Sequence, residues 1–365
     1  MRTALLGTRG IPGRYGGFET FAEELSTRLA GRGHRVTVYC RDHHTSSSYR
    51  GVDLVWLPTI RHKYLDTLAH TFLSTLHLAF RRGPYPIDAA LYCNAANAIF
   101  TCLPRIAGIP VALNVDGIER KRKKWNRLAR AWYFVSEYLS TMFPNRFVTD
   151  AEAIRRYYRE NWNADSLFIP YGADTTPATT RETPGLLGLQ PGRYFLYVSR
   201  LEPENRALEV REAFEDVPAP DMKLAIVGDA PYSGDYIRRV RETKDPRIVI
   251  PGAIYGTGYR ELRTWCFAYV HATEVGGTHP ALIEAMALGA LVIYLDTPEN
   301  REVCADAGIP YGSQAELTAR MIAATQMSEP ERAVYKQRAF QRVRERYNWD
   351  AVTAQYETLL ATLRK

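Results

Sequence analysis

The chain has 365 residues, enough for two domains of ordinary size, and 46% of them are hydrophobic and 24% charged. No apolar run reaches the roughly 18–20 residues that a membrane-spanning helix needs, and the apolar stretch after Met1 is too short for a signal peptide. The five cysteines include no CxxC pair, which argues against a disulfide framework or a zinc site. These features predict a globular cytoplasmic protein with free thiols.

The net charge of +7 favours anionic partners, and much of it is concentrated in one segment. Residues 119–130 contain seven bases and a single acid, Glu119. Aromatic residues are not interleaved with these bases as a stacking platform for nucleic acid would require. The expected partners are therefore phosphorylated small molecules or an anionic membrane surface, and not nucleic acid.

The first half of the chain alternates short apolar runs with helical patterns, which predicts a parallel sheet with helices on both faces. The clearest helix is Phe18–Arg32, whose apolar residues recur at helical spacing. The predicted strands are Thr3–Gly7, Val36–Cys40, Leu54–Leu57, Ala89–Cys93, Val111–Asp116, Phe147–Asp150 and Leu167–Tyr171.

A polar stretch rich in Thr, Pro and Gly interrupts this alternation, which then restarts. The pattern predicts two Rossmann-like α/β domains, over residues 1–172 and 191–347, which are joined by a linker at 173–190 and face a cleft. A last helical segment within 348–365 could cross back to the N-terminal domain. The strands predicted for the second domain are Tyr194–Ser199, Lys223–Gly228, Arg247–Pro251, Ala268–Thr273 and Leu291–Leu295.

The first loop joins a strand to a helix and is rich in glycine. Gly16 and Gly17 would let the backbone approach a ligand closely, and the start of the helix offers N–H groups to an anion. The spacing is not GxGxxG, so no dinucleotide fingerprint is matched, and a turn without function is the alternative. Glu19 either belongs to this site or merely complements the helix dipole.

Asp116 and Asp150 each end a predicted strand, so both should lie at the carboxyl edge of the sheet, where α/β domains bind ligands. A carboxylate there can position or deprotonate an acceptor hydroxyl. Asp150 has a structural alternative, because Thr149 and Glu152 fit a capping box.

The helix between these two strands is amphipathic and has a basic flank. Arg120, Lys121 and Lys124, together with Trp125, could contact a charged acceptor or an anionic membrane. The alternative is a helix that faces the core and has a solvated basic end. Its apolar stripe consists of Trp125, Leu128, Trp132, Val135, Leu139 and Met142.

In the second half, Arg200 follows an apolar strand and is suited to bidentate contact with phosphate. The most specific run begins at Gly276 and Gly277 and continues through Thr278 into a helix that has Pro280 in its first turn. Backbone N–H groups at such a helix start favour a diphosphate, and Glu284, one turn later, can accept hydrogen bonds from sugar hydroxyls.

At these residues the sequence resembles the retaining family 4 glycosyltransferases, which have the GT-B fold. In that family an Arg at the end of a strand and a Lys five residues later hold the donor diphosphate. Arg200 matches the Arg, Asn205 stands in place of the Lys, and Arg206 could substitute for it. Of two family glutamates, Glu284 matches the second, which typically holds the ribose, whereas the first position is Gly276.

A narrower resemblance rests on GTRGIPxRYGGFET near the start, on the residues that follow Asp116, on Pro-Glu-Asn at 203–205, and on Gly-Gly-Thr-x-Pro at 276–280. These motifs resemble β-1,4-rhamnosyltransferases of cell-wall and capsular polysaccharide assembly. Such enzymes use dTDP-rhamnose and a lipid-diphosphate-linked acceptor, and Asp116 and Asp150 fall on positions regarded as essential in them.

The resemblance implies a metal-independent, retaining hexosyltransferase without a cofactor. Its donor would be a dTDP- or UDP-sugar bound by the second domain, and its acceptor a lipid-linked saccharide bound by the first. It would work in the cytoplasm, with a peripheral contact to the inner face of the membrane. The alternatives are a GT-B-type sugar-nucleotide epimerase and a non-catalytic, sugar-nucleotide-binding subunit of a polysaccharide assembly complex.

Overall fold

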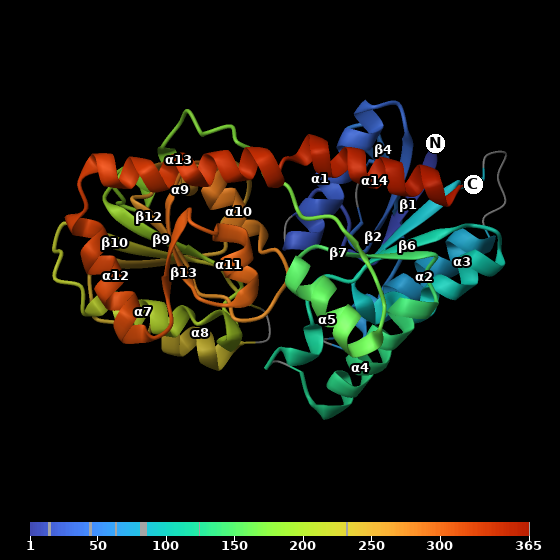
Figure 1. Ribbon diagram of the computed structural model, residues 1–365, viewed down its shortest axis with the longest axis horizontal. Helices are drawn as coiled ribbons and strands as arrows, with labels where there is room; N and C mark the ends of the chain where they lie inside the picture. The colour runs from blue at the N-terminus through green and yellow to red at the C-terminus, as the bar shows by residue number, and fades with distance from the viewer. Residues whose placement is uncertain are drawn as a thin grey trace. The chain divides into compact units, whose positions relative to one another are not determined.

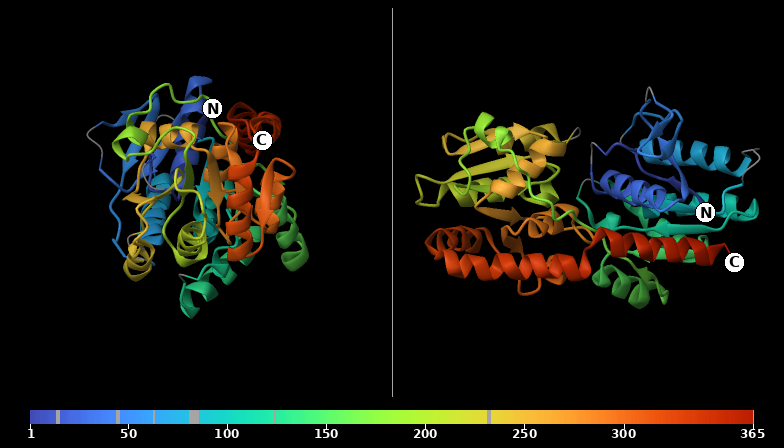
Figure 2. Two further views of the ribbon diagram at one scale, coloured as in Figure 1. Left: turned by 90° about the vertical axis from the view of Figure 1, so that its left-hand side faces the viewer. Right: turned by 90° about the horizontal axis from the view of Figure 1, so that it is seen from above.

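The computed structural model describes residues 1–13, 16–43, 46–62, 64–80, 86–123, 125–230 and 233–364. It divides into two compact units. Unit 1 contains residues 1–121, 125–172 and 349–365, and unit 2 contains residues 122–124 and 173–348. In each unit, helices cover both faces of a central sheet (Figures 1 and 2).

The sheet of unit 1 has eight strands in the order β3-β4-β2-β1-β5-β6-β7-β8, and all its pairs are parallel except β3 with β4. The parallel strands are short apolar runs, as expected for a sheet that is covered on both sides. The strands are β1 Arg2–Leu6, β2 Arg35–Cys40, β3 Ser48–Tyr49, β4 Val52–Trp56, β5 Ala89–Cys93, β6 Val111–Asn114, β7 Arg146–Thr149 and β8 Leu167–Phe168.

Side chains alternate between the two faces of this sheet. Ala90, Tyr92 and Leu113 enter a core that also contains Leu78 of α2 and Ile154 of α5. The opposite face carries α1 and α14, which pack against each other. The helices are α1 Gly17–Gly31, α2 Asp66–Phe80, α3 Cys102–Ile106, α4 Arg127–Met142, α5 Glu152–Trp162 and α14 Trp349–Leu363, with short 3-10 helices at Ala95–Thr101 and Glu119–Lys121.

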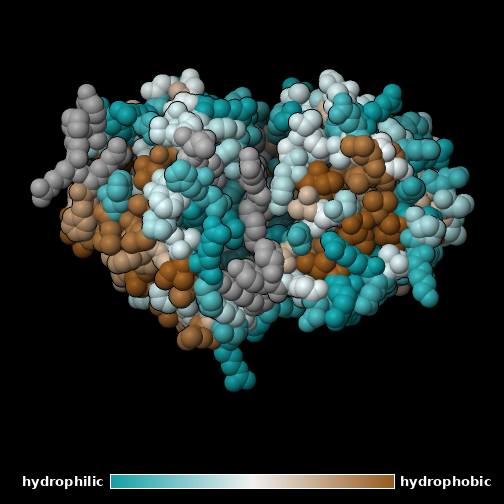
Figure 3. Space-filling view, turned by 180° about the vertical axis from the view of Figure 1, so that it is seen from behind, coloured by the Kyte–Doolittle hydropathy of each residue, from teal (hydrophilic) through white to brown (hydrophobic). Residues whose placement is uncertain are grey.

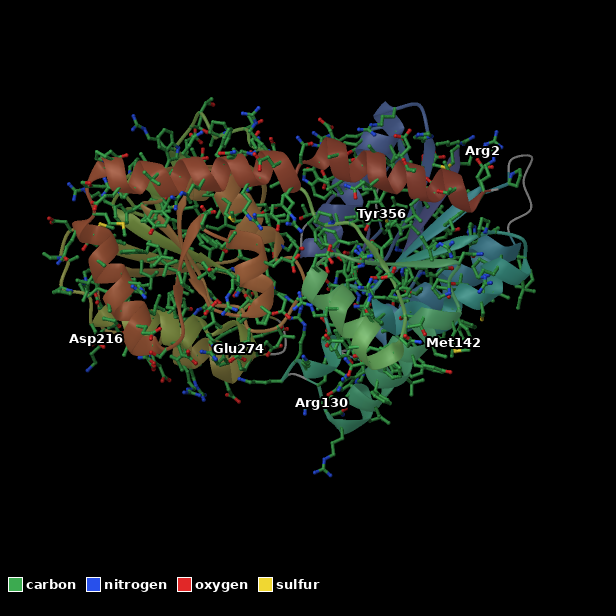
Figure 4. All side chains as sticks on the ribbon, in the orientation of Figure 1. Arg2, Arg130, Met142, Asp216, Glu274 and Tyr356 are labelled. Carbon is green, nitrogen blue, oxygen red and sulfur yellow. The ribbon has the colours of Figure 1, made fainter. Side chains whose placement is uncertain are left out.

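The last helix, α14, belongs to unit 1 although its sequence follows unit 2. Its Tyr356 hydroxyl lies 2.9 Å from the Asn114 side-chain amide on β6, and its ring packs edge-on against Phe21 of α1 (Figure 4). Trp349 joins the same aromatic cluster at Phe21. Burial of these large rings anchors the C-terminal segment on the sheet of unit 1.

The sheet of unit 2 has six parallel strands in the order β11-β10-β9-β12-β13-β14. Phe195, Leu224 and Val270 face one side, where they pack with Phe214 of α7 and Met321 of α12. On the other side, α10 and α13 contact β13. The strands are β9 Tyr194–Val198, β10 Lys223–Val227, β11 Ile248–Gly252, β12 Ala268–His271, β13 Leu291–Leu295 and β14 Gly308–Tyr311.

The helices of unit 2 are α6 Glu182–Leu186, α7 Ala207–Glu215, α8 Gly234–Arg241, α9 Gly256–Trp265, α10 Pro280–Ala287, α11 Pro298–Cys304, α12 Gln314–Gln326 and α13 Glu329–Arg346, with a 3-10 helix at Pro203–Asn205. The first and last segments of the unit pair with each other, because the Ala173 N–H donates to the Tyr347 carbonyl at 2.8 Å.

Candidate active site

The strand order of unit 2 reverses direction between β9 and β12. From this point the chain adds β10 and β11 on one side, and β13 and β14 on the other. Open parallel sheets bind ligands at such a switch point, outside the carboxyl ends of the strands. The loops that leave β9 and β12 there contain residues 199–206 and 272–279, and we call them the arginine–glycine loops.

The arginine–glycine loops contact each other directly. The backbone N–H of Glu274 donates to the carbonyl of Glu204 at 3.0 Å, and Arg206 Nε donates to a carboxylate oxygen of Glu274 at 2.7 Å (Figure 4). Arg206 has a φ of 56°, an uncommon conformation for a residue with a side chain. Its guanidinium also contacts Glu209 at 3.1 Å, so Arg206 ties the two loops together through paired charges.

Arg200 has a partly exposed side chain, and its Nη2 lies 3.8 Å from Glu202 Oε2. Asn205 is buried, and its amide nitrogen donates to the Arg200 carbonyl at 2.6 Å. The Tyr197 hydroxyl donates to the Asn205 carbonyl at 2.5 Å, which secures the loop from the strand below. Asn205 therefore fixes the backbone that presents Arg200.

Gly276, Gly277 and Thr278 are buried and lead into α10, with Pro280 at its first position and His279 as the N-cap residue. Within the described part of the chain, no side-chain hydrogen bond caps the start of this helix. The first backbone N–H groups of a helix have no partner within the helix, and the helix dipole favours negative charge at this end. The turn therefore suits a phosphate or diphosphate group.

His279 explains why position 276 is a glycine. A Cβ atom at Gly276 would lie 2.1 Å from His279 Nε2, far inside van der Waals contact. The imidazole is held in place, because its Nδ1 lies 2.8 Å from Asn300 Oδ1 and 3.1 Å from His271 Nε2. An acid at 276, which the family resemblance would place there, would collide with this ring.

Asn300 also fixes the protonation of His279. Both hydrogens of the Asn300 amide nitrogen serve backbone carbonyls, at Thr273 and Leu295, so its Oδ1 must accept and His279 Nδ1 carries the proton. Burial lowers the pKa of His279 to about 4, although the bond to Asn300 opposes that shift. The imidazole beneath the glycine turn is therefore neutral at physiological pH.

Glu284, on α10, is oriented by two residues of α9. Tyr259 donates its hydroxyl to Glu284 Oε2 at 2.9 Å, and Arg263 Nη1 lies 3.1 Å from the same oxygen. The Arg263 guanidinium stacks 3.9 Å from the centre of the Tyr259 ring. Burial and then the Glu284 charge raise the pKa of Tyr259 well above its usual value, so the phenol stays a donor.

Unit 1 has its own switch point, between β1 and β5. Gly7 ends β1 with a φ of 90°, and a Cβ there would lie 2.4 Å from the Cys93 carbonyl at the end of β5. Only glycine allows this approach. Glu19 is buried on α1 and accepts the Arg9 N–H at 3.0 Å, so it holds the loop that follows β1.

Asp116 and Asp150 follow β6 and β7, which are neighbours in the sheet. Asp116 has a φ of 61°, and its N–H donates to the Asn114 side chain at 3.0 Å. Backbone strain of this kind clusters at functional sites. Asp150 is fully buried. We call the carboxylates Glu19, Asp116 and Asp150 the acidic strand edge.

The charges of these carboxylates act on buried groups nearby. Burial raises the pKa of Tyr171 well above its usual value, and the charges of Asp116 and Asp150 add to that shift. The pKa of Cys93 is raised by burial and then by the charges of Glu19 and Asp116. All three carboxylates therefore act on the same small region of unit 1.

The capping alternative for Asp150 is not realised. Helix α5 has Ala151 as its N-cap residue and no side-chain cap, and the Thr149 hydroxyl lies 2.7 Å from that of Ser166 instead. Glu152, in the first turn of α5, lies 3.7 Å from Arg155. Thr149 is therefore not the N-cap residue that the capping-box alternative requires.

The bases at 119–130 have different surroundings in the structure: some contact acidic or aromatic side chains, and others are exposed. The Arg120 guanidinium bonds both oxygens of Glu137 at 3.1 Å and the Tyr157 hydroxyl at 2.6 Å. Lys121 lies over the Tyr157 ring, and Trp125 donates to Glu119 at 3.2 Å. Lys124 lies outside the described residues. Arg127 and Arg130 are exposed at the start of α4.

The apolar stripe predicted on α4 points mostly to the surface. The residues that α4 buries are Tyr133, Ser136, Glu137 and Ser140, whereas Leu128 is 80% exposed. Hydrophobic side chains gather on this side of unit 1 (Figure 3). We call the exposed residues of α2, α3 and α4 there the apolar surface: Phe72, Phe80, Ile106, Leu128, Phe134, Val135, Tyr138 and Met142.

Three further observations bear on chemistry. All five cysteines are free. Among the described residues, His, Cys, Asp and Glu form no group of three or more that could hold a metal ion. Within the same ranges, no helix is both long enough and apolar enough to cross a membrane.

Comparisons with known proteins agree with this architecture. Residues 192–326 match the family model of the group 1 glycosyl transferases, and residues 1–174 match that of a domain of unknown function, DUF1972. HepE from Anabaena, solved in complex with UDP and glucose, superposes with a TM-score of 0.80 at 16% identity over 99% of this chain and all of its own. The chain has the GT-B fold.

Two other glycosyltransferase structures support this assignment. Sucrose-phosphate synthase from Thermosynechococcus elongatus has a TM-score of 0.80 at 17% identity, over 99% of this chain and 98% of its own. WaaG, a glycosyltransferase involved in lipopolysaccharide biosynthesis, has a TM-score of 0.73 at 15% identity, over 99% of both chains. No curated protein sequence matches the chain.

Several residues that shape the site were not predicted from the sequence. His271 and Asn300 support His279, and Tyr259 and Arg263 orient Glu284. Glu204, in the loop after β9, is fully buried. The one available signal was chemical, because histidine, asparagine and arginine within otherwise apolar segments need partners when they are buried.

Proposed function

We propose that the chain is a glycosyltransferase that takes a sugar from a nucleoside diphosphate bound to the arginine–glycine loops of unit 2. The proposal is supported by the contact between the loops that leave β9 and β12 at one switch point, since these loops contain Arg200 and the two-glycine turn, and by the orientation of Glu284 on the helix that follows. Arg200 and the α10 N–H groups suit the diphosphate, and Glu284 suits the hydroxyls of the ribose. The Anabaena structure, solved with UDP-glucose, supports a uridine diphosphate carrier, and the subgroup resemblance suggests a thymidine one.

The acidic strand edge of unit 1 is proposed to serve the acceptor. Asp116 would orient the attacking hydroxyl or stabilise the cationic sugar centre, with Asp150 beside it. The bond between the sugar and the diphosphate breaks, its electrons pass to the diphosphate, the acceptor oxygen bonds to the same carbon, and the proton of the acceptor hydroxyl passes to the departing diphosphate. Gly16 and Gly17 at the uncapped start of α1 remain candidates for a further phosphate contact.

The finer proposal follows the subgroup resemblance. It is a retaining, metal-independent transfer of L-rhamnose from dTDP-β-L-rhamnose to a lipid-diphosphate-linked saccharide in polysaccharide biosynthesis, within family 4. No side chain at the acidic strand edge is set apart as a covalent nucleophile by the residue pattern, so we favour attack on the same face as the departing diphosphate.

The test of donor class is a thermal-shift screen of dTDP, UDP, GDP and their sugars against the full chain. A bound ligand raises the melting temperature by mass action. We expect dTDP- or UDP-sugars to raise it and GDP-sugars to have less effect. A flat response to every nucleotide and nucleotide sugar would contradict the proposed function.

The same donor then separates the alternatives. Incubation of donor alone, followed by NMR, would reveal an epimerase through an isomerised nucleotide sugar. Tight binding without turnover on any lipid-linked acceptor would instead favour a non-catalytic subunit. Transfer that requires an acceptor supports the proposed reaction.

A lipid-linked acceptor is consistent with the apolar surface of unit 1. Its exposed residues on α4 lie near Arg127 and Arg130, and basic side chains beside an apolar face favour anionic lipid. We therefore propose a peripheral contact between this surface and the cytoplasmic face of a membrane.

Liposome pelleting tests this contact. Wild type should bind vesicles that contain anionic lipid, and the bound fraction should fall as salt screens the charges. Leu128→Ser should weaken binding, whereas Leu186→Ser, at an equally exposed leucine of unit 2, should not. The proposed contact would be excluded if vesicle binding depended neither on lipid charge nor on salt concentration and was unchanged in Leu128→Ser.

A further inference from the structure

Glu204 is an unusual residue in unit 2. Its side chain is fully buried, and neither carboxylate oxygen has a hydrogen-bond partner within the described part of the chain. Buried carboxylates in proteins are normally paired or hydrogen-bonded, because burial without a partner is costly. A group of this kind calls for an explanation by function.

Asn205 adds a third acceptor beside Glu204. Because its amide nitrogen donates to the Arg200 carbonyl at 2.6 Å, the other side-chain atom is the carbonyl oxygen, Oδ1. This oxygen is also buried and without a partner. Two adjacent residues thus hold three acceptor atoms, and among the described residues none of the three receives a donor.

The place of these acceptors is the switch point of unit 2. Glu204 lies four residues after Arg200, and its own carbonyl accepts the Glu274 N–H, two residues before the glycine turn. Glu204 is therefore at the junction of the two arginine–glycine loops. The loops that we propose to hold the diphosphate enclose this carboxylate.

The chemistry of the acceptors excludes an anion as their partner. Three oxygen acceptors, one of them a carboxylate, would repel a phosphate but would accept hydrogen bonds from hydroxyl groups. The family acid that could otherwise serve the sugar cannot be placed at Gly276, because the His279 ring occupies the space that its Cβ needs.

We propose that Glu204, together with Asn205 Oδ1, accepts hydrogen bonds from the hydroxyl groups of the transferred sugar. This inference rests on the proposed function and deepens it, since it assigns the sugar and the diphosphate to different residues of the same loop. Arg200 and the glycine turn bind the phosphates, whereas Glu204 recognises the sugar ring.

The test compares a nucleotide with its sugar conjugate by calorimetric titration. Glu204→Gln keeps the shape of the side chain and removes its charge. The affinity of this variant for dTDP should stay within about 2-fold of the wild-type value. Its affinity for dTDP-L-rhamnose should fall by ~10-fold or more, which is the usual effect of losing a hydrogen bond to a charged group. If wild type prefers UDP-glucose, UDP and UDP-glucose form the pair.

The matched control is Glu212→Gln, the same chemical change at a partly exposed residue of α7. It should alter neither affinity. Unfolding of the free proteins provides a second measurement, because removal of an unpartnered buried charge should leave the melting temperature of Glu204→Gln unchanged or higher. Should that variant not fold, Glu204→Asp retains the charge, shortens its reach and should show the same selective loss.

The outcomes separate this inference from the proposed function. If wild type binds no nucleotide sugar, the proposed function fails. If wild type binds the conjugate and Glu204→Gln binds both ligands as wild type does, the role of Glu204 is overturned. Equal weakening of nucleotide and conjugate would also overturn it, because it would indicate a structural or phosphate role.

Discussion

The two units have the same reversal of strand order at their switch points, but they differ in the groups that the loops carry there. In unit 2 the loops after β9 and β12 bring Arg200, Arg206 and backbone N–H groups to the edge of the sheet. In unit 1 the corresponding edge carries Glu19, Asp116 and Asp150. Since parallel sheets place loop residues at the same edge, the fold determines where ligands bind and the side chains determine which ligands.

The contrast assigns different work to each unit. Cationic groups and a helix N-terminus attract a diphosphate, which is the leaving group of the proposed reaction. Carboxylates attract hydroxyl groups and a developing positive charge.

The largest effect is expected from Asp116. Asp116→Asn removes the charge that would orient the acceptor, and the transfer rate should fall on the order of 100-fold or more, the size of one general-base contribution. The measurement is the initial rate with a saturating donor and a lipid-linked acceptor, while the affinity for dTDP should not change.

A control for that experiment is Asp165→Asn, at an exposed carboxylate that precedes β8 and pairs with Arg159. It should transfer at nearly the wild-type rate. Near-normal transfer by Asp116→Asn would remove this residue from the mechanism.

The next effect concerns phosphate binding in unit 2. Arg200→Ala should lower the affinity for dTDP and UDP by ~10-fold or more, because it removes a charge-assisted hydrogen bond to phosphate. Arg238→Ala removes the same charge from an exposed position on α8 and should have little effect. Equal affinities of wild type and Arg200→Ala in a direct titration would contradict a phosphate role for Arg200.

The sheets and their edges could be predicted from the sequence because buried parallel strands are continuous apolar runs. The runs Ala89–Cys93 and Leu291–Leu295 coincide with β5 and β13. Strand β14, Gly308–Tyr311, was not predicted, since a four-residue edge strand with glycine and proline carries little pattern. The GT-B fold followed from the alternation and the motifs together.

The candidate site was harder to predict because burial in loops leaves no periodic signal. The sequence indicated Arg200, Glu284 and Asp116 as candidates, but not the burial of Glu204 or the support of His279 by Asn300. Helix α4 illustrates the same limit. Its spacing predicted an amphipathic helix, yet its buried face contains Glu137, because Arg120 and Tyr157 satisfy that carboxylate.

A smaller effect should follow from the contact between Gly276 and His279. Gly276→Ala places a methyl group against a ring held by Asn300, and overpacking of this kind costs about 1–3 kcal/mol. Urea unfolding of the single variants and of Gly276→Ala/His279→Ala should reveal coupling, since the smaller side chain at 279 makes room. Strict additivity of the two changes would mean that the collision is relieved elsewhere.

The smallest effect is a pH dependence that both units share through one buried histidine each. Burial lowers the pKa of His279 in unit 2 to about 4, and burial with the nearby Arg41 charge lowers that of His70 in unit 1 to about 4 as well. Because both values lie below the unfolded pKa of about 6.5, the unfolded chain binds more protons at mildly acidic pH. The contribution of these two histidines to the free energy of unfolding is therefore fully present above about pH 6.5. It is lost progressively as the pH falls towards 4.

His279→Asn should reduce the loss of unfolding free energy at acidic pH in unit 2 alone. Asparagine keeps a donor near Asn300 but does not titrate, so the difference in unfolding free energy between pH 7 and pH 5 should shrink relative to wild type. His70→Asn should act in the same direction on unit 1, and urea unfolding followed by probes in each unit would resolve the two. An unchanged pH dependence in His279→Asn would mean that the imidazole beneath the glycine turn can be protonated without cost, which contradicts its burial against Asn300.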